Sequence, residues 1–370
     1  MVEGNAILTA LGKTGLLLLI IVPMIISFIV VPFLKRIGIM LGAYAVENER
    51  TVHKGKIVRI GGVAIYLSFM ITMSIFSKAD IQVNGILYGG TIIFLVGLVD
   101  DMIDLPAFVK LGGQILAALV AMIVGGVRLD IIYLPFQMSI DMGIISMIIT
   151  FFWIIGITNA INLIDGLDGL STGISIIVLG TISFIGFMMN NLGVTTMALV
   201  LLGAALGFLP FNFHPAKIFV GDCGALFLGY MIACFSLLGF KTATFITLGF
   251  PVVMLFVPIS DTLIAIIRRK LKGISFSTGD REHLHHILMY KLNLGHRNAV
   301  LALYTVTGLF ALTAIVSFYN ETFGMIMLLL LVLVFELFVE ATGMINKKFH
   351  PLMGLSRRIC GYPKKKEEKE

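Results

Sequence analysis

Long apolar stretches alternate with short polar segments along almost the whole chain. The stretches lie near residues 15–34, 61–77, 86–99, 108–125, 143–161, 171–189, 195–210, 225–240, 243–267, 298–317 and 323–343. About 20 apolar residues in helical form cross the hydrocarbon core of a bilayer, and most of the stretches approach that length. The pattern therefore predicts an all-α polytopic membrane protein with about 11 transmembrane helices.

The composition agrees with this class. Of the 370 residues, 58% are hydrophobic and 13% are charged, whereas a soluble domain has about a quarter of its residues charged. We expect one membrane domain over residues 1–343 and a basic, partly disordered tail over residues 344–370. Glu3 and Lys13 precede the first stretch and no small-residue cleavage site follows it, which predicts a retained helix. Three cysteines cannot all pair, so no disulfide framework is indicated.

Lysine and arginine are distributed unevenly between the two sides of the predicted bundle. Fifteen fall in segments that follow the odd-numbered stretches, counting Lys110 at a boundary, and four fall on the other side. Because cytoplasmic loops contain an excess of these residues, the richer side is predicted to be cytoplasmic. An odd number of helices then places the N-terminus outside and the C-terminus in the cytoplasm.

Polar motifs gather on the predicted cytoplasmic side. They are Asp100, Asp101 and Asp104 after the third stretch, the run from Asn159 to Leu170 after the fifth, Gly221-Asp222-Cys223-Gly224 before the eighth, and His283-Leu-His-His286 after the ninth. A cation or proton transporter, the alternative from another functional class, would more often place polar residues near the bilayer midplane. Only Asp261 is a candidate for such a deep position. The placement favours a site where a soluble charged substrate meets a lipid headgroup.

The run from Asn159 to Leu170 contains four oxygen-bearing side chains at intervals of three residues. They are Asn159, Asn162, Asp165 and Asp168. At this spacing they are predicted to form one slanting stripe along a helix. Oxygen ligands suit a hard cation such as Mg²⁺ and therefore phosphate chemistry. The alternative is a plain helix end with turn glycines at Gly166 and Gly169.

The negative charges of the three carboxylates after the third stretch need to be balanced. Asp100, Asp101 and Asp104 lie within five residues, and like charges so close require a cation, a proton or a basic partner. Lys110, one to two helical turns further on, is a candidate partner or phosphate ligand. A helix end solvated by water is the alternative.

The remaining motifs combine an acidic residue with aromatic and basic ones. Asp222, next to Gly221, is a candidate metal ligand, with capping of the following helix as the alternative. Phe219 is a candidate for stacking on a base; the alternative is that it only packs against other apolar residues at the membrane surface. Basic residues around the three histidines suit a pyrophosphate. Lys54, Lys56 and Arg59 form a second basic group, for which the general excess of positive charge in cytoplasmic loops is the alternative explanation.

At these residues the chain resembles the polyprenyl-phosphate N-acetylhexosamine-1-phosphate transferase family. The matching motifs are Arg59-Ile-Gly-Gly62, Asp100-Asp101-x-x-Asp104-Leu, Asn159-x-x-Asn-x-x-Asp-Gly-Leu-Asp-Gly-Leu170, Phe219-x-Gly-Asp-x-Gly224 and His283-x-His-His286, within a region from His53 to about Val300. The resemblance implies ten or eleven membrane helices around a cytoplasmic cleft. It also implies attack of a polyprenyl phosphate on the β-phosphorus of a UDP-N-acetylhexosamine, with Mg²⁺ and release of UMP.

Two motifs indicate the N-acetylglucosamine-1-phosphate branch of this family. The muramoyl-pentapeptide branch tends to have Pro-Thr-Met-Gly-Gly where this chain has Val58-Arg-Ile-Gly-Gly62, and three consecutive histidines where it has His-Leu-His-His. Transfer of phospho-N-acetylmuramoyl-pentapeptide, or use of another UDP-N-acetylhexosamine, remains the alternative. Cys223 and Ala225 stand where the family often has serines, which argues against a hydroxyl role there.

The resemblance also implies roles for individual residues and partners. The catalytic group is Asp100, Asp101 and Lys110; the metal ligands are Asn162 and Asp222; the substrate-binding residues are Lys54, Arg59, Asn159, Asp165, Asp168, Asn212, Phe219, His283, His285 and His286. The expected cofactor is Mg²⁺, with Mn²⁺ as a substitute. The expected partners are undecaprenyl phosphate, UDP-N-acetylglucosamine and the cell membrane, without nucleic acid, and a homodimer is left open.

Overall fold

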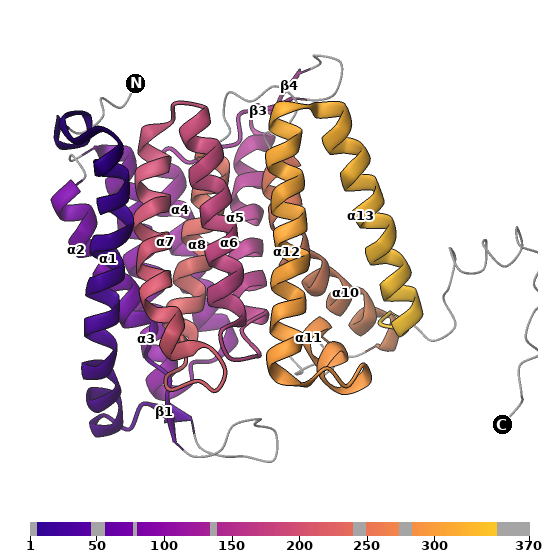
Figure 1. Ribbon diagram of the computed structural model, residues 1–370, viewed down its shortest axis with the longest axis horizontal. Helices are drawn as coiled ribbons and strands as arrows, with labels where there is room; N and C mark the ends of the chain where they lie inside the picture. The colour runs from indigo at the N-terminus through magenta and orange to yellow at the C-terminus, as the bar shows by residue number, and fades with distance from the viewer. Residues whose placement is uncertain are drawn as a thin grey trace, which may run out of the picture.

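A computed structural model describes residues 6–45, 56–76, 80–133, 139–239, 249–273 and 283–345. The helices are α1 (Ala6–Met40), α2 (Gly62–Phe76), α3 (Ile81–Ile103), α4 (Ala107–Ile123), α5 (Ile145–Leu163), α6 (Leu170–Met188), α7 (Leu192–Asn212), α8 (Gly221–Gly239), α9 (Gly249–Met254), α10 (Phe256–Lys272), α11 (Leu284–His286), the π-helical turn η1 (Ile287–Lys291), α12 (Gly295–Tyr319) and α13 (Glu321–Thr342). Figure 1 shows most of the long helices standing side by side in one bundle. The all-α membrane class predicted from the sequence is confirmed.

Most of the predicted apolar stretches are single helices. Among the described residues, eight helices are long and apolar enough to cross a membrane, and α2 and α4 are shorter apolar helices. The stretch predicted over 243–267 is different. Its described part consists of α9 and α10, which are separated at Leu255. Pro258 has no N–H to donate to Met254, so one continuous helix is disfavoured there, and the described part of this stretch forms two helices.

Helix α8 lies at the centre of the bundle and is buried along its whole length. Helices α2, α3, α5 and α6 pack around it. Glycines allow the closest approaches: a Cβ atom on Gly97 of α3 would lie 2.6 Å from the backbone of Asp222 and Cys223, and one on Gly62 of α2 would lie 2.2 Å from the backbone of Gly224. These contacts bring the first turn of α8 close to the ends of α2 and α3.

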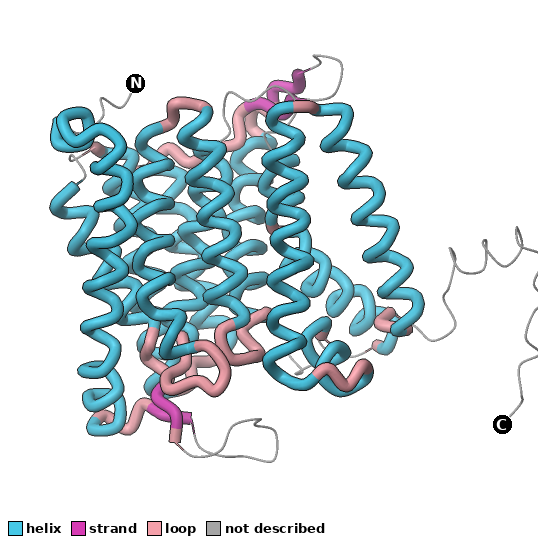
Figure 2. Tube along the Cα trace, viewed as in Figure 1, coloured by secondary structure: helices cyan, strands magenta, loops and turns pink. Residues whose placement is uncertain are grey.

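Two short antiparallel sheets lie at opposite ends of the bundle. Strands β3 (Ile131–Tyr133) and β4 (Ser139–Asp141) pair antiparallel as a hairpin at one end. Strands β1 (Tyr44–Ala45) and β2 (Ile57–Val58) pair at the other end. Figure 2 shows this second end surrounded by loops, and α1 starts at the hairpin end whereas α13 finishes at the loop end. The polar motifs meet at the loop end.

Candidate active site

Four helix ends supply a cluster of polar side chains, which we call the acidic cluster: Asp100, Lys110, Asn162 and Asp222. Lys110 Nζ of α4 lies 2.7 Å from Asp100 Oδ2 of α3 and 3.0 Å from Asp222 Oδ2 of α8. Asn162 Nδ2 of α5 donates to Asp222 Oδ1 at 2.9 Å. The predicted pairing of Lys110 with the acidic group is therefore present. Asp100 is 3% exposed, so the ammonium group compensates a carboxylate that is largely removed from water.

Asp101, next to Asp100, has a different environment. Its Oδ1 and Oδ2 accept the backbone N–H groups of Asp222 and Cys223, at 2.8 and 2.9 Å. Asp101 thus caps the first turn of α8, where a carboxylate is favoured by the helix dipole. The alternative that Asp222 is itself the cap was wrong, because the Asp222 side chain contacts Lys110 and Asn162 instead. Gly221 has φ 70°, and its missing side chain leaves room for the Arg59 carbonyl and the Asp101 carboxylate.

The predicted stripe from Asn159 to Asp168 is only partly helical. Helix α5 ends at Leu163, and Asp165 and Asp168 lie in the turn before α6. Gly169, immediately before α6, has φ 77°, a left-handed conformation that glycine adopts readily and that is not part of a regular helix. The prediction of one continuous helical stripe was therefore wrong beyond Leu163.

The four residues of the stripe have separate partners. Asn159 exchanges two hydrogen bonds with Gln114 of α4, at 3.1 and 2.6 Å. Asn162 belongs to the acidic cluster, and Asp165 accepts a hydrogen bond from Ser171 Oγ at 2.6 Å. Burial raises the pKa of Asp165 well above its ordinary value; the Ser171 bond opposes this, and nearby carboxylates add to it. Asn162 is therefore the member of the stripe that hydrogen-bonds directly to Asp222.

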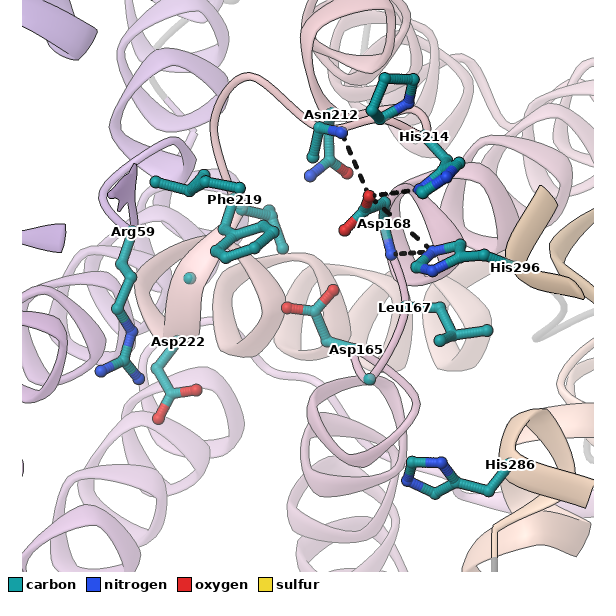
Figure 3. A pocket seen from close by; sticks show the side chains of 16 residues that line it. Arg59, Asp165, Leu167, Asp168, Asn212, His214, Phe219, Asp222, His286 and His296 are labelled. Carbon is teal, nitrogen blue, oxygen red and sulfur yellow. Dashed lines mark hydrogen bonds and ion pairs between the residues drawn. The ribbon is translucent and has the colours of Figure 1, made fainter. Parts of the chain in front are cut away.

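A cavity of about 580 Å³ opens beside the acidic cluster. Figure 3 shows the side chains around it, with Asp222 and Arg59 at one side and Asp168 and two histidines at the other. Its lining includes Ile57, Arg59, Asp165, Gly166, Leu167, Asp168, Asn212, His214, Pro215, Ala216, Phe219, Val220, Gly221, Asp222, His286 and His296. This volume lies in the range of sites for small molecules and cofactors. Many of the predicted substrate-binding residues thus surround one cavity.

His214 and His296 border this cavity and were not predicted as site residues. His214 Nδ1 donates to Asp168 Oδ2 at 2.8 Å, as does the backbone N–H of Ala216 at 3.1 Å. His296 Nε2 accepts the backbone N–H of Asp168 at 2.9 Å, and the two imidazole rings stack at 4.1 Å. His214 therefore orients the Asp168 carboxylate, and His296 holds the Asp168 backbone. His296 lies 128 residues from Asp168, and no spacing signal in the sequence relates them.

Among the described residues, we compare two groups of side chains as ligands for a metal ion. Ligand atoms of Asp168, His214 and His296 lie within 4.8 Å of one another, but the lone pair of His296 Nε2 already accepts a hydrogen bond. The acidic cluster offers carboxylate and amide oxygens around a point where a positive group, the Lys110 ammonium, already lies between Asp100 and Asp222. Oxygen ligands of this kind fit Mg²⁺ or Mn²⁺, so the cluster is the better candidate for the expected cation.

The three predicted histidines lie in one compact segment. His283 precedes α11, and the His283 and His285 rings are parallel within 5° at 5.7 Å. His285 is buried against the Asp165–Asp168 turn, where a Cβ atom on Gly166 would lie 2.3 Å from His285 Nε2. Burial first, and then the nearby His286, lower the pKa of His285 to about 3. His285 is therefore neutral at physiological pH and adds no positive charge for a phosphate, whereas His286 lines the cavity.

The remaining predicted residues are placed as follows. Arg59 lines the cavity and forms a 3.5 Å ion pair with the exposed Asp104. Asn212 also lines the cavity, but its amide bonds to Thr172 and to the carbonyl of Ile218, which fixes the turn before α8. Phe219 lies at the cavity wall. Lys54 is outside the described residues.

A buried acidic cluster that fits a hard cation, beside a nucleotide-sized pocket at one end of a membrane helix bundle, defines the class of membrane-embedded phosphate-group transferases. Comparison with known proteins makes this more specific. Residues 83–240 match the sequence model described as "Glycosyl transferase family 4".

Whole-chain relatives extend the match. The chain is 37% identical over 345 residues to the probable undecaprenyl-phosphate N-acetylglucosaminyl 1-phosphate transferase of Bacillus subtilis (strain 168), covering 92% of this chain and 95% of the relative. It is 33% identical to the decaprenyl-phosphate N-acetylglucosaminephosphotransferase of Mycobacterium tuberculosis (strain H37Rv), covering 80% and 81%. It is 32% identical to the phospho-N-acetylmuramoyl-pentapeptide-transferase of Staphylococcus carnosus (strain TM300), covering 80% and 93%. The chain belongs to the polyprenyl-phosphate N-acetylhexosamine-1-phosphate transferase family.

Proposed function

We propose that this enzyme transfers N-acetylglucosamine 1-phosphate from UDP-N-acetylglucosamine to undecaprenyl phosphate, releasing UMP at the cytoplasmic face of the cell membrane. The main support is the acidic cluster beside the cavity, where Asp100, Asp222 and Asn162 meet Lys110. The activity in the name of the Bacillus subtilis relative and the His-Leu-His-His motif support this sugar over the muramoyl-pentapeptide alternative. The excess of lysine and arginine on one side supports the cytoplasmic face.

The two ends of the cavity suggest where each part of the donor lies. Phe219, Asp168 and Asn212 line the part that would take the uridine, with Phe219 stacking on the base. The Asp168 carboxylate, oriented by His214, keeps Oδ1 available to accept a hydrogen bond from the base. Asp222 at the other side lies beside the acidic cluster, where the diphosphate would be placed.

Asn162 and Asp222 would hold Mg²⁺, with water completing its coordination. The cation would neutralise charge on the diphosphate. Lys110, held between Asp100 and Asp222, would stabilise negative charge as the phosphoryl group is transferred. Asp100 would orient the lipid phosphate, while Asp101 fixes the first turn of α8 that presents Asp222.

We favour direct attack by the lipid phosphate over a covalent aspartyl intermediate. A phosphate monoester has a second pKa of about 6, so it is mostly dianionic at neutral pH and needs little help from a base. Asp100, furthermore, is already engaged by Lys110 and by the backbone N–H of Leu105. Enzyme mixed with UDP-sugar and Mg²⁺, but without polyprenyl phosphate, should release no stoichiometric burst of UMP. A burst together with a sugar-phosphate adduct on Asp100 or Asp101 would disprove direct attack and leave the transferase assignment intact.

The substrate assignment is tested with the purified protein. It is supplied with undecaprenyl phosphate, Mg²⁺ and, in separate reactions, UDP-N-acetylglucosamine, UDP-N-acetylgalactosamine or UDP-N-acetylmuramoyl-pentapeptide, and the lipid product is identified by mass spectrometry. We expect N-acetylglucosaminyl diphosphoundecaprenol and UMP. Product from the muramoyl-pentapeptide donor alone would overturn the proposed sugar.

The proposed membrane orientation needs a separate test. Single cysteines introduced near Arg297 should resist a membrane-impermeant thiol reagent in intact cells and react after the cells are opened. A cysteine placed near Arg128, at the hairpin end, serves as the matched accessible position. Efficient labelling near Arg297 from outside would reverse the orientation.

A further inference from the structure

Asp261 is a buried acidic residue of α10 that belongs neither to the acidic cluster nor to the cavity lining. It is 2% exposed. Its Oδ2 lies 2.9 Å from His283 Nδ1, and its Oδ1 accepts the backbone N–H of Leu284 at 2.8 Å. Both oxygens therefore bind the beginning of the segment His283–Lys291, which we call the histidine segment. A buried carboxylate is stable only with such partners. The Asp261 side chain is therefore held in place by the protein and is not a charge exposed to solvent.

The same contact determines the hydrogen positions on His283. An ionised carboxylate can only accept hydrogen bonds, so His283 Nδ1 donates and Nε2 has the lone pair when the ring is neutral. Carboxylate–imidazole pairs of this kind orient histidines that act elsewhere in a site. The His283 ring is buried together with Asp261, which protects the pair from competition by water.

The histidine segment connects this pair to the cavity. The His283 ring is parallel to that of His285 at 5.7 Å, and His285 packs directly on Gly166, in the turn that contains Asp165 and Asp168. The His285 ring lies 4.3 Å from that of His286, which lines the cavity. A shift at His283 would therefore displace both the wall residue His286 and the turn at Gly166.

We propose that Asp261 is a positioning residue for the transfer reaction: it fixes His283 and Leu284, and thereby places His286 and the Asp165–Asp168 turn around the donor. This inference rests on the proposed transferase function. In the sequence, Asp261 was the only candidate for the deep polar position that a transporter would need. The proposal assigns it to the transferase site instead. Asp261 itself touches no substrate and acts only through the histidine segment.

Two substitutions separate orientation from packing. Asp261→Asn keeps an oxygen for Leu284 N–H but directs an amide N–H₂ group at His283 Nδ1, which must then accept, so the ring hydrogen moves to Nε2. Asp261→Ala removes both contacts. We expect kcat/KM for the UDP-sugar to fall about tenfold in the first variant and about a hundredfold in the second, the range typical of residues that orient a site histidine. Asp130→Asn, an exposed carboxylate at the hairpin end, should have no effect.

A double-mutant cycle tests whether Asp261 acts through His283. In a His283→Ala background, Asp261→Asn should lower kcat/KM by less than about twofold, because the contact is already lost. A full tenfold loss in that background would show that Asp261 acts independently and would overturn the proposal. Variants that lower the thermal midpoint while the folded enzyme keeps wild-type kcat/KM would also overturn it, since the role would then be structural alone.

A measurement that does not depend on turnover distinguishes failure of the positioning role of Asp261 from failure of the proposed transferase function. Hydrogen–deuterium exchange of the peptide containing Leu284 should accelerate in Asp261→Ala and not in Asp130→Asn, whatever substrate the enzyme uses. If wild-type protein transferred no sugar phosphate from any UDP-sugar, the proposed function would fail, but the exchange result would still test whether Asp261 holds Leu284. If wild-type protein were active and Leu284 exchanged equally in both variants, the positioning role would fail alone.

Discussion

The acidic cluster and the histidine segment border the same cavity but are built in opposite ways. The cluster joins the ends of four helices, and its charges compensate one another through Lys110. The histidine segment is buried at its beginning, where the His285 ring is neutral at physiological pH, and it is held by the Asp261 carboxylate and a close contact with Gly166. In the proposed reaction, the acidic cluster would supply charge and the histidine segment would position the groups around the donor.

This difference predicts how each region responds to change. Removing a charge from the cluster alters the electrostatics of the reacting groups directly, and such losses are usually large. Displacing the histidine segment would change the geometry of the proposed donor site, while Asp168 and its contacts with His214 and His296 would stay in place. We therefore expect the largest effects in the acidic cluster and smaller, graded effects in the histidine segment.

The largest loss is expected for Asp222→Asn. The substitution removes the negative charge that Lys110 and the expected cation share, while the amide keeps the size of the side chain. Turnover of UDP-N-acetylglucosamine should fall by at least about a hundredfold, and the Mg²⁺ concentration for half-maximal activity should rise. The measurement is initial rate against Mg²⁺ concentration.

Asn162→Ala should show a similar defect through loss of the amide that contacts Asp222. Thermal midpoints measured in detergent check that both variants remain folded. Near-normal turnover of either variant at limiting Mg²⁺ would remove that residue from the set of metal ligands.

Among the acidic residues at the end of α3, Asp101→Asn compares Asp101 with its neighbour Asp100. Asparagine retains one good acceptor for the N–H groups of Asp222 and Cys223 and loses the charge at the first turn of α8. We expect a loss of about 2 kcal/mol in stability and about a thirtyfold loss of activity, because the first turn of α8 presents Asp222. Asp100→Asn should lower activity with little change in the thermal midpoint. Equal stability losses in both variants would refute the capping role of Asp101.

Much of the acidic cluster could be predicted from the sequence because its signals are local. Asp100 and Asp101 stand together at the end of an apolar stretch, and Asp222 stands next to Gly221 at the start of another. Position at a helix end and like-charge proximity are properties of a few neighbouring residues. The sequence could not show that Asp101 would cap a helix more than a hundred residues away, because that contact depends on how α3 packs on α8.

Gly166→Ala is expected to have an intermediate effect that acts through the histidine segment. The new methyl group would lie 2.3 Å from His285 Nε2, so the turn or the ring must move. Activity should fall about tenfold, since overpacking of a closely packed contact displaces its neighbours. Gly180→Ala on α6, where no atom lies within 4 Å of the added Cβ, is the matched control and should keep full activity. Equal activity of the two variants would mean that the Gly166 contact does not matter.

The contacts around the histidines could not be predicted from local patterns. The motif His283-Leu-His-His286 identified the segment, but its two anchors, Asp261 and Gly166, come from separate helices and turns. His214 and His296 meet across 82 positions to orient Asp168. The helical stripe from Asn159 to Asp168 also failed beyond Leu163, because the glycines of the turn outweighed the three-residue spacing. Packing between distant segments determined the contacts of the histidines, whereas the end of the stripe has a local cause in the turn glycines.

The smallest effect is expected in the pH dependence of stability, and it isolates His285. The pKa of this buried ring is about 3, below its ordinary value of 6.5. Between these values the unfolded chain binds a proton that the folded chain does not. Stability from this group is therefore complete above about pH 6.5 and is lost as the pH falls, by roughly 2 kcal/mol between pH 7 and pH 5.

His285→Gln has no such proton to bind in the unfolded chain. The thermal midpoint of the wild-type protein in detergent should therefore fall by several degrees more between pH 7 and pH 5 than that of the variant. Other titrating groups, including Asp165, are shared by both proteins and cancel in the comparison. Identical pH dependence would mean that His285 gains its proton in the folded state. The histidine segment would then supply charge as the acidic cluster does, and the contrast between the two regions would fail.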